Sequence, residues 1–280
     1  MKEITLEVNA PLPEFKEPPV VEVALSVQFE PLSRLSTHDL ALYWSDVLER
    51  KFVWKEGPVL SPTFEFFGIN PPPTSVEIVF QLEVPPPHRT LFFSADDTDL
   101  VQIQRDRFVR NWRKANQKPY PRYASIRTKF REQFEAFCRF VAEHELGACV
   151  PNQCEVTYVN HIPWGLDGQP REALSEVLTA WSARAANTFL GPPEQVEAAA
   201  HYVIKMADDR VGRLHVAAQH ARRPDDLQSL MALTLTARGR PASDRIDDVM
   251  NFLDLGHEYV VRGFASLTTP AMHERWGRTA

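Results

Sequence analysis

The sequence predicts an α+β protein made of two tandem β-α-β-β-β-α repeats, and three observations lead to this fold class. Short segments in which apolar and polar residues alternate recur along the chain, which is typical of half-buried antiparallel strands. Two longer segments, 123–144 and 243–264, place apolar residues at helical spacing. The second half of the chain repeats the order of elements found in the first.

Composition restricts the class of protein further. The 280 residues are 44% hydrophobic and 24% charged with a formal net charge of −6, which excludes collagenous, disordered and supercharged chains. No stretch approaches the roughly 18 apolar residues of a membrane helix, and the N-terminus lacks the basic and apolar regions of a secretory signal. We therefore expect a cytoplasmic protein with no membrane partner.

Prolines cluster in the first half of the chain. The prolines of residues 1–19 predict an extended N-terminal arm, because proline lacks an N–H and biases the preceding residue away from helix. The first repeat then spans residues 20–147. Its strands are expected at 23–29, 74–84, 90–94 and 100–105, its first helix is expected to be capped by Ser36 or Thr37, and its long helix is expected at 123–144.

The second repeat, residues 148–280, shows the same pattern. Its strands are expected at 155–161, 195–206, 213–220 and 228–237, and its helices at 171–189 and 243–264, the latter capped by Ser243 or Asp244. In each repeat an antiparallel sheet would wrap its apolar face around the long helix. This arrangement resembles helix-grip or TATA-binding-protein-like folds, an analogy that does not carry function with it.

Known catalytic motifs are absent from the sequence: it has no glycine-rich phosphate loop, no G-x-S-x-G, no H-E-x-x-H and no paired C-x-x-C. Cys138, Cys149 and Cys154 lie close to His144 and His161, but their uneven spacing is unlike that of a zinc site. We expect them to be reduced cysteines packed as small apolar residues, and we expect no metal or cofactor.

Four histidines, His201, His215, His220 and His257, fall on the second repeat. His215 and His220 are five residues apart, so on one strand they would point to opposite faces and would not form a catalytic pair. His257 is expected to be a hydrogen-bonded histidine at the edge of the core. A hydrolase or nuclease using His215, His257 and Asp208 or Asp209 is a third function class, disfavoured because these residues match no motif spacing.

The segment 102–123 combines basic and aromatic residues and carries the candidate partner-binding side chains. Arginine, tryptophan and tyrosine suit a protein hot spot, and guanidinium and aromatic groups also suit nucleic acid, which the net charge of −6 makes the weaker alternative. A purely structural role is also open, in which Trp112 anchors the strand-to-helix connection and the basic residues form a solvated rim. The candidates are Arg105, Arg107, Arg110, Trp112, Arg113, Tyr120 and Tyr123.

Three segments carry a resemblance to a known family. They are Q-x-D-R-F-x-x-N-W-R (104–113) with the following Y-P-x-Y (120–123), P-V-V-E-V (19–23) and C-E-V-T-Y-V-N-H (154–161). Together they resemble the signature of a sporadically distributed family of uncharacterised bacterial proteins, which has no established activity to carry over. Scattered distribution of this kind implies a part in phage defence or in a toxin–antitoxin pair.

These observations favour a non-enzymatic binding or regulatory protein over an enzyme. The first hypothesis is that it binds another protein, the effector of a bacterial defence or toxin–antitoxin system, through the 102–123 segment and the proline-rich arm. The alternative is a module that senses a ligand or nucleotide in a cavity between the sheet and a long helix. The oligomeric state cannot be predicted from these residues.

Overall fold

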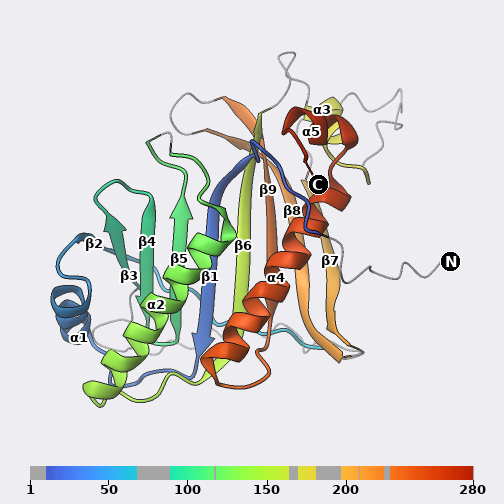
Figure 1. Ribbon diagram of the computed structural model, residues 1–280. Coiled ribbons are helices and arrows are strands. Elements are labelled where there is room, and N and C mark those ends of the chain that lie inside the picture. Colours follow the sequence, from blue (N-terminus) through green and yellow to red (C-terminus); the bar gives the residue numbers. More distant parts are fainter. Residues whose placement is uncertain are drawn as a thin grey trace.

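The computed structural model describes residues 11–67, 89–116, 118–163, 170–180, 197–207, 209–223 and 228–279. Within these ranges the chain forms a single antiparallel sheet of nine strands, covered by helices, so the α+β class is confirmed (Figure 1). The strands are β1 (Val20–Phe29), β2 (Phe52–Gly57), β3 (Arg89–Ser94), β4 (Asp99–Gln104), β5 (Arg107–Arg113), β6 (Pro151–Pro163), β7 (Glu197–Met206), β8 (Asp209–Arg222) and β9 (Ser229–Gly239). The helices are α1 (Thr37–Leu42), the π-helical turn η1 (Tyr43–Val47), α2 (Arg122–Glu143), α3 (Pro170–Val177), α4 (Ile246–Leu267) and α5 (Pro270–Arg275).

One sheet contains strands from both halves of the chain. Its strand order is β2-β3-β4-β5-β1-β6-β9-β8-β7. Strands from the two halves of the sequence meet where β1 pairs with β6, in a register that sets Val23 opposite Tyr158 and Leu25 opposite Val156. The two halves therefore share one sheet.

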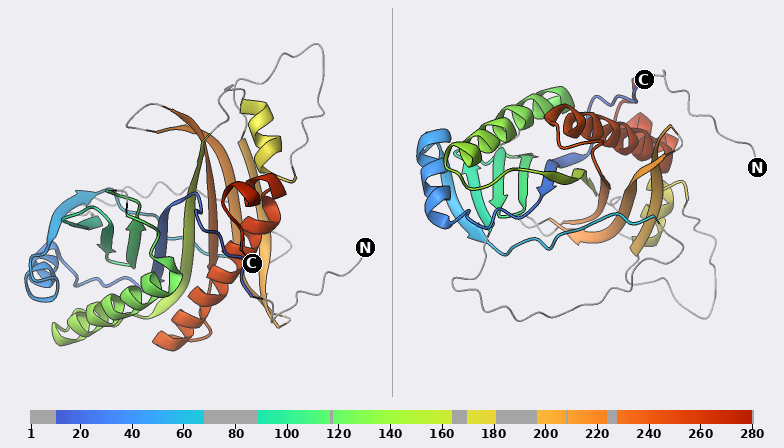
Figure 2. Two further views of the ribbon diagram at one scale, coloured as in Figure 1. Left: turned by 45° about the horizontal axis from the view of Figure 1, so that its top comes forward. Right: turned by 90° about the horizontal axis from the view of Figure 1, so that it is seen from below.

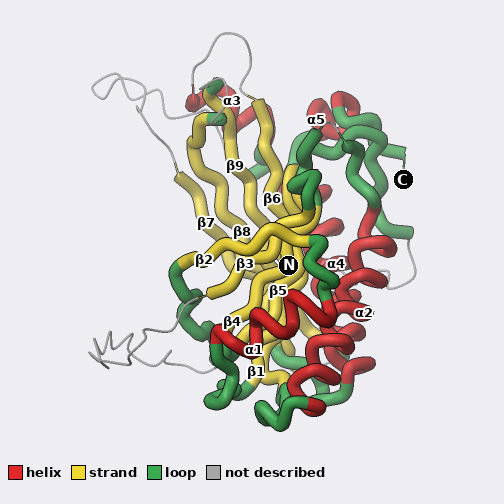
Figure 3. Tube along the Cα trace, turned by 90° about the vertical axis from the view of Figure 1, so that its left-hand side faces the viewer, coloured by secondary structure: helices red, strands yellow, loops and turns green. Residues whose placement is uncertain are grey.

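Both long helices cover the same face of the sheet, as Figures 2 and 3 show. The residues of α2 at helical spacing, Ile126, Phe130, Phe134, Phe137 and Val141, are all buried, as the sequence predicts. They pack with the inward residues of β1 and β5 into an aromatic core. The opposite face of the sheet carries mainly polar side chains and is crossed by residues 58–67 (Figure 2, right).

The boundaries predicted from the sequence agree with the structure for most elements, and the exceptions are as follows. The sequence predicts no strand at β2 or β5, because the first helical stripe extends as far as Phe52 and residues 107–113 fall within the predicted binding segment 102–123. The helix expected at 171–189 ends at Val177 among the described residues, and the strand expected at 74–84 lies outside them. Helix α4 begins later than predicted and has Arg245 as its N-cap, because the Ser243 hydroxyl bonds the Asp248 carboxylate instead.

The predicted cap of the first helix is confirmed at Ser36. Its hydroxyl accepts a hydrogen bond from the Asp39 N–H, and the Asp39 carboxylate accepts one from the Ser36 N–H at 2.9 Å. This reciprocal capping box satisfies two backbone donors that the helix cannot satisfy itself.

No helix in the described part of the chain has the length and apolar character needed to cross a membrane.

Candidate ligand-binding site

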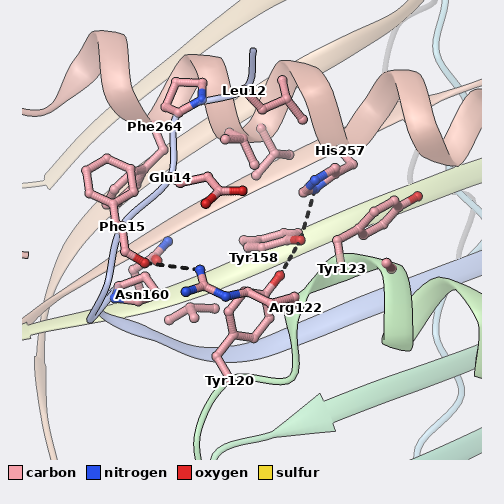
Figure 4. Close-up of a pocket in the computed structure, with 16 residues that line it drawn as sticks. Leu12, Glu14, Phe15, Tyr120, Arg122, Tyr123, Tyr158, Asn160, His257 and Phe264 are labelled. Carbon is pink, nitrogen blue, oxygen red and sulfur yellow. Dashed lines mark hydrogen bonds between the residues drawn. The ribbon is translucent and has the colours of Figure 1, made fainter. Parts of the chain in front are cut away.

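A cavity of about 400 Å³ lies where the two halves of the chain meet. Its floor comes from β1 and β6, its walls from α4 and the beginning of α2, and its roof from the N-terminal arm (Figure 4). A volume of this size falls in the range of ordinary small-molecule sites. The lining residues are Leu12, Pro13, Glu14, Phe15, Pro18, Val20, Tyr120, Arg122, Tyr123, Ala124, Tyr158, Asn160, His257, Val260, Val261 and Phe264.

The described part of the arm is fixed to the C-terminal end of the chain. Backbone hydrogen bonds join Lys16 N–H to Gly277 O and Glu17 N–H to Trp276 O, both at 3.1 Å. The Phe15 ring is buried and makes an edge contact with Phe264 of α4, with ring centroids 5.6 Å apart. Proline-rich sequence keeps this segment extended, and one aromatic side chain anchors it over the cavity.

The connection from β5 to α2 supplies the opposite wall. Trp112 is buried and its ring packs 5.2 Å from that of Tyr120, so it anchors this connection as the structural interpretation predicts. Arg122 begins α2 with a φ of 68°, a conformation that is unusual for a residue with a side chain. Its guanidinium donates to the Phe15 carbonyl at 3.0 Å and thereby ties the arm to the helix.

A chain of hydrogen bonds crosses the cavity from one half of the protein to the other. The Tyr120 and Tyr158 hydroxyls are 2.9 Å apart, and the Tyr158 hydroxyl is 3.0 Å from Nδ1 of His257. Each hydroxyl can donate or accept, so the chain can run in either direction and His257 Nε2 becomes a donor or an acceptor accordingly. This hydrogen-bond chain can thus meet either a donor or an acceptor on a ligand while its own three side chains stay uncharged.

Tyr123 and His257 form a stacked pair beside this chain. Their ring centroids are 3.7 Å apart and the planes are within 8° of parallel. The Tyr123 hydroxyl donates to Asp254 at 2.9 Å, and Arg127 holds the same carboxylate with two hydrogen bonds of 2.6 and 2.8 Å. Since Tyr123 and Arg127 belong to α2 and Asp254 to α4, this network fixes the spacing of the two long helices at the cavity.

Burial keeps these groups neutral. Desolvation lowers the pKa of His257 to about 4 and raises the pKa of Tyr120 to about 12. It also raises the pKa of Tyr158 well above its ordinary value, with the neighbouring Tyr120 adding to the effect. An uncharged imidazole and uncharged phenols among valine and phenylalanine side chains favour a largely apolar ligand, and Glu14 and Arg122 are the charged residues of the described lining.

The lowered pKa of His257 makes stability depend on pH. The unfolded chain binds a proton at His257 near pH 6.5, but the folded protein binds it only near pH 4, so the unfolded state holds more protons between these values. Lowering the pH from 7 to 4 should therefore cost about 3 kcal/mol of unfolding free energy through this residue. Urea titrations across this range, on the wild type and His257→Gln, would measure it. Parallel pH curves for the two proteins would contradict the assignment.

The structure separates the seven predicted partner-binding residues into different environments. Arg107, Arg110 and Trp112 are buried, Tyr120 and Tyr123 line the cavity, Arg113 is partly exposed and Arg105 is exposed. Arg107 faces the polar side of the sheet, whereas Arg110 lies at a small pocket that α2 also lines and pairs with Asp99. These residues do not form one surface.

The remaining histidines and the cysteines lie elsewhere. His215 packs against His201 on the polar face of the sheet, with their Nδ1 atoms 2.9 Å apart, so it does not meet His257 on the helix side. Asp208 lies outside the described residues. Cys138, Cys149 and Cys154 are free thiols, and the described residues contain no group of three or more His, Cys, Asp or Glu that could hold a metal ion.

The three segments that carry the family resemblance converge on the cavity. Tyr120 and Tyr123 come from Y-P-R-Y, Tyr158 and Asn160 from C-E-V-T-Y-V-N-H, and Val20 from P-V-V-E-V. Sequence analysis did not select Tyr158 or Asn160, because strand alternation alone does not distinguish a core residue from a cavity residue. The signal that could have identified them is their place in the C-E-V-T-Y-V-N-H segment that carries the resemblance. A comparison of the chain with protein-family models and with curated proteins finds no match.

Proposed function

We propose that this protein is a non-enzymatic ligand-binding regulator that holds a largely apolar small molecule in the cavity between the sheet and helix α4. The observation that carries the proposal is the convergence of three separate sequence segments on one cavity of about 400 Å³. Aromatic and valine side chains would supply the binding energy, and the Tyr120–Tyr158–His257 chain would orient the polar group of the ligand.

The state of the titratable groups supports binding over catalysis. A general acid or base works best with a pKa near the operating pH, whereas burial moves the pKa of His257 to about 4 and that of Tyr120 to about 12. The described lining contains no serine, cysteine or lysine, and its one carboxylate, Glu14, has no hydrogen bond to the Tyr120–Tyr158–His257 chain among the described contacts. The site is better suited to recognising a molecule than to transforming it.

Filling the cavity with a large side chain should weaken the binding of an apolar ligand. Val261 lines the cavity and is half-buried, so Val261→Trp would place an indole in the space that a ligand needs. With Nile red as a neutral apolar probe, we expect at least a tenfold loss of affinity, measured by fluorescence titration. The matched control is Val150→Trp, because Val150 is exposed and does not line the cavity. Equal affinity in all three proteins would refute the proposal, and mass spectrometry of protein from native cells would identify the natural ligand.

We also infer that the fold consists of two tandem repeats arranged as in helix-grip or TATA-binding-protein-like folds. The strand order supports this inference, because β3-β4-β5-β1 on one side of the centre has its counterpart in β7-β8-β9-β6 on the other. A long helix follows the last strand of each set. In this interpretation β2 is an addition to the first repeat, and the cavity lies near the pseudo-twofold axis.

As a second proposal, the protein binds a protein effector of a bacterial defence or toxin–antitoxin system. The family resemblance and the composition of residues 102–123 support it. Arg105 and Arg113 are the members of the predicted set that a partner could reach. Copurification from the native operon would test it. Elution of the protein alone at native expression would reject it.

A further inference from the structure

Residues 58–67, here called the strap, cross the polar face of the sheet opposite the long helices (Figure 2, right). The strap leaves β2 at one edge and reaches β8 near the other, so it contacts strands from both halves of the protein. It contains Pro58 and Pro62 and none of it is assigned to a helix or strand. Its contacts with the sheet show how this extended segment is held.

The sheet recognises the strap through the strap's backbone. Gln104 of β4 accepts from the Leu60 N–H and donates to the Leu60 carbonyl, both at 2.9 Å. Gln28 of β1 accepts from the Thr63 N–H at 2.9 Å. Arg107 of β5 donates to the Ser61 carbonyl at 3.1 Å and Arg213 of β8 to the Phe66 carbonyl at 2.6 Å. Backbone groups are common to all peptides, so these contacts do not depend on the strap's own sequence.

One carboxylate supplies the specific contact. Glu65 is buried and accepts from Arg213 at 2.7 Å and from His215 at 2.5 Å, with Arg238 Nη1 at 3.6 Å. Among the described contacts it is the only strap side chain with a hydrogen bond or ion pair. Three cationic or protonatable side chains therefore converge on a single acidic position. The Phe67 ring adds a cation–π contact with Arg213.

The strap leaves some polar groups of the surface beneath it without hydrogen-bond partners among the described residues. Gln153 of β6 is the cross-strand neighbour of Gln28, is 2% exposed and makes no hydrogen bond through either amide atom among the described residues. Arg107 Nε is also buried and has no hydrogen-bond partner among the residues that the structure describes. Buried polar groups without partners destabilise the arrangement that buries them. Phe64 and Phe66 of the strap are 40% and 50% exposed. A different peptide could thus fit this surface better than the strap does.

We propose that the polar face of the sheet is a docking surface for an extended acidic segment of another protein, and that the strap occupies it within the same chain until such a segment displaces it. Gln28, Gln104 and Arg107 would hold the backbone of the incoming segment, and Arg213, His215 and Arg238 would hold its carboxylate. This surface is on the opposite side of the sheet from the ligand cavity, so the inference does not depend on the proposed ligand.

The test uses the full chain and a labelled decapeptide with the strap sequence, Pro-Val-Leu-Ser-Pro-Thr-Phe-Glu-Phe-Phe, in fluorescence polarisation. In the wild type the strap competes at high effective concentration. Glu65→Gln weakens the strap's anchor, so we expect this variant to bind the peptide at least tenfold more tightly than wild type. Glu143→Gln, an exposed change at the end of α2, is the matched control and should behave as wild type. A peptide with glutamine in place of its glutamate should bind at least tenfold more weakly.

Two outcomes would overturn the proposal. One is a folded Glu65→Gln protein, judged by circular dichroism, that binds the peptide no more tightly than wild type. The other is tighter binding of a ten-nucleotide single-stranded DNA than of the peptide, which would assign the surface to nucleic acid. If Glu65→Gln does not fold, hydrogen exchange of the wild type decides the matter. The Leu60 and Thr63 amides should exchange at least a hundredfold faster than the β1 amides, and equal protection would refute displacement.

Discussion

Asp99→Ala is expected to lower the unfolding free energy by about 3–5 kcal/mol, although the residue removed is itself partly exposed. Its partner Arg110 has a side chain that is only 1% exposed and lies at a pocket shared with helix α2. Asp99 provides the carboxylate in its ion pair, and Lys129 approaches the same carboxylate at 3.5 Å. Removing Asp99 takes away the ion-pair and hydrogen-bond partner of the buried Arg110 charge and leaves only the electrostatic attraction of Glu132. Urea denaturation of the wild type and the variant would measure the loss.

The matched change Arg110→Met should have a much smaller effect. Nε and Nη1 of Arg110 are buried and have no hydrogen-bond partner in the described part of the chain, so the guanidinium is poorly satisfied even with Asp99 present. Replacing a buried ion pair by apolar groups of similar size is often neutral or stabilising. We therefore expect the Arg110→Met, Asp99→Ala double variant to recover most of the stability lost in Asp99→Ala. If Asp99→Ala lies within about 1 kcal/mol of wild type, the buried charge has another source of compensation.

Phe108→Ala is expected to cost about 3–5 kcal/mol. The Phe108 ring is fully buried and lies 5.9, 5.5 and 5.4 Å from the rings of Phe130, Phe134 and Phe137, measured between centroids. It is therefore the point at which β5 contacts the apolar face of α2. Truncation removes these contacts and leaves a cavity that three aromatic rings cannot easily fill. Thermal and urea unfolding would both report the change.

Phe93 provides the control for Phe108. It lies on β3 with its ring half-buried, near Lys55 and Arg113 rather than other aromatic rings. Phe93→Ala should cost about 1 kcal/mol, as is usual for a change outside the core. Similar losses for both variants would mean that the aromatic core under α2 contributes less than its geometry indicates.

The fold class and most elements could be predicted because they depend on local periodicity. The apolar stripe of α2 and the alternation in β6, β8 and β9 are visible in the sequence, and the structure places these elements within a few residues of the predicted ranges. β5 could not be predicted in this way. On β5, Arg110 points toward the helices, and Arg107 and Asn111 point toward the opposite face of the sheet. Polar residues therefore occur on both faces of a buried strand, and the alternation of apolar and polar residues that predicts a strand is missing.

The candidate site was only partly predictable. Tyr120 and Tyr123 were selected for their composition, and His257 was expected to be a hydrogen-bonded histidine at the core edge, which its contact with Tyr158 confirms. The cavity itself depends on the approach of α2, α4 and the arm, which are far apart in sequence. The contact between Glu65 and His215 likewise joins residues 150 positions apart. Local pattern contains no information about such distant pairs.

The pairing of β1 with β6 has a consequence for how the chain must be made. These two strands form the middle of the sheet, and each belongs to a different half of the sequence. A fragment that ended before β6 would present the whole length of β1 as an unpaired edge, and the complementary fragment would present β6 in the same way. Long uncovered edges of this kind invite association with other chains. During synthesis, the free edge of β1 is therefore covered only after β6 has been translated.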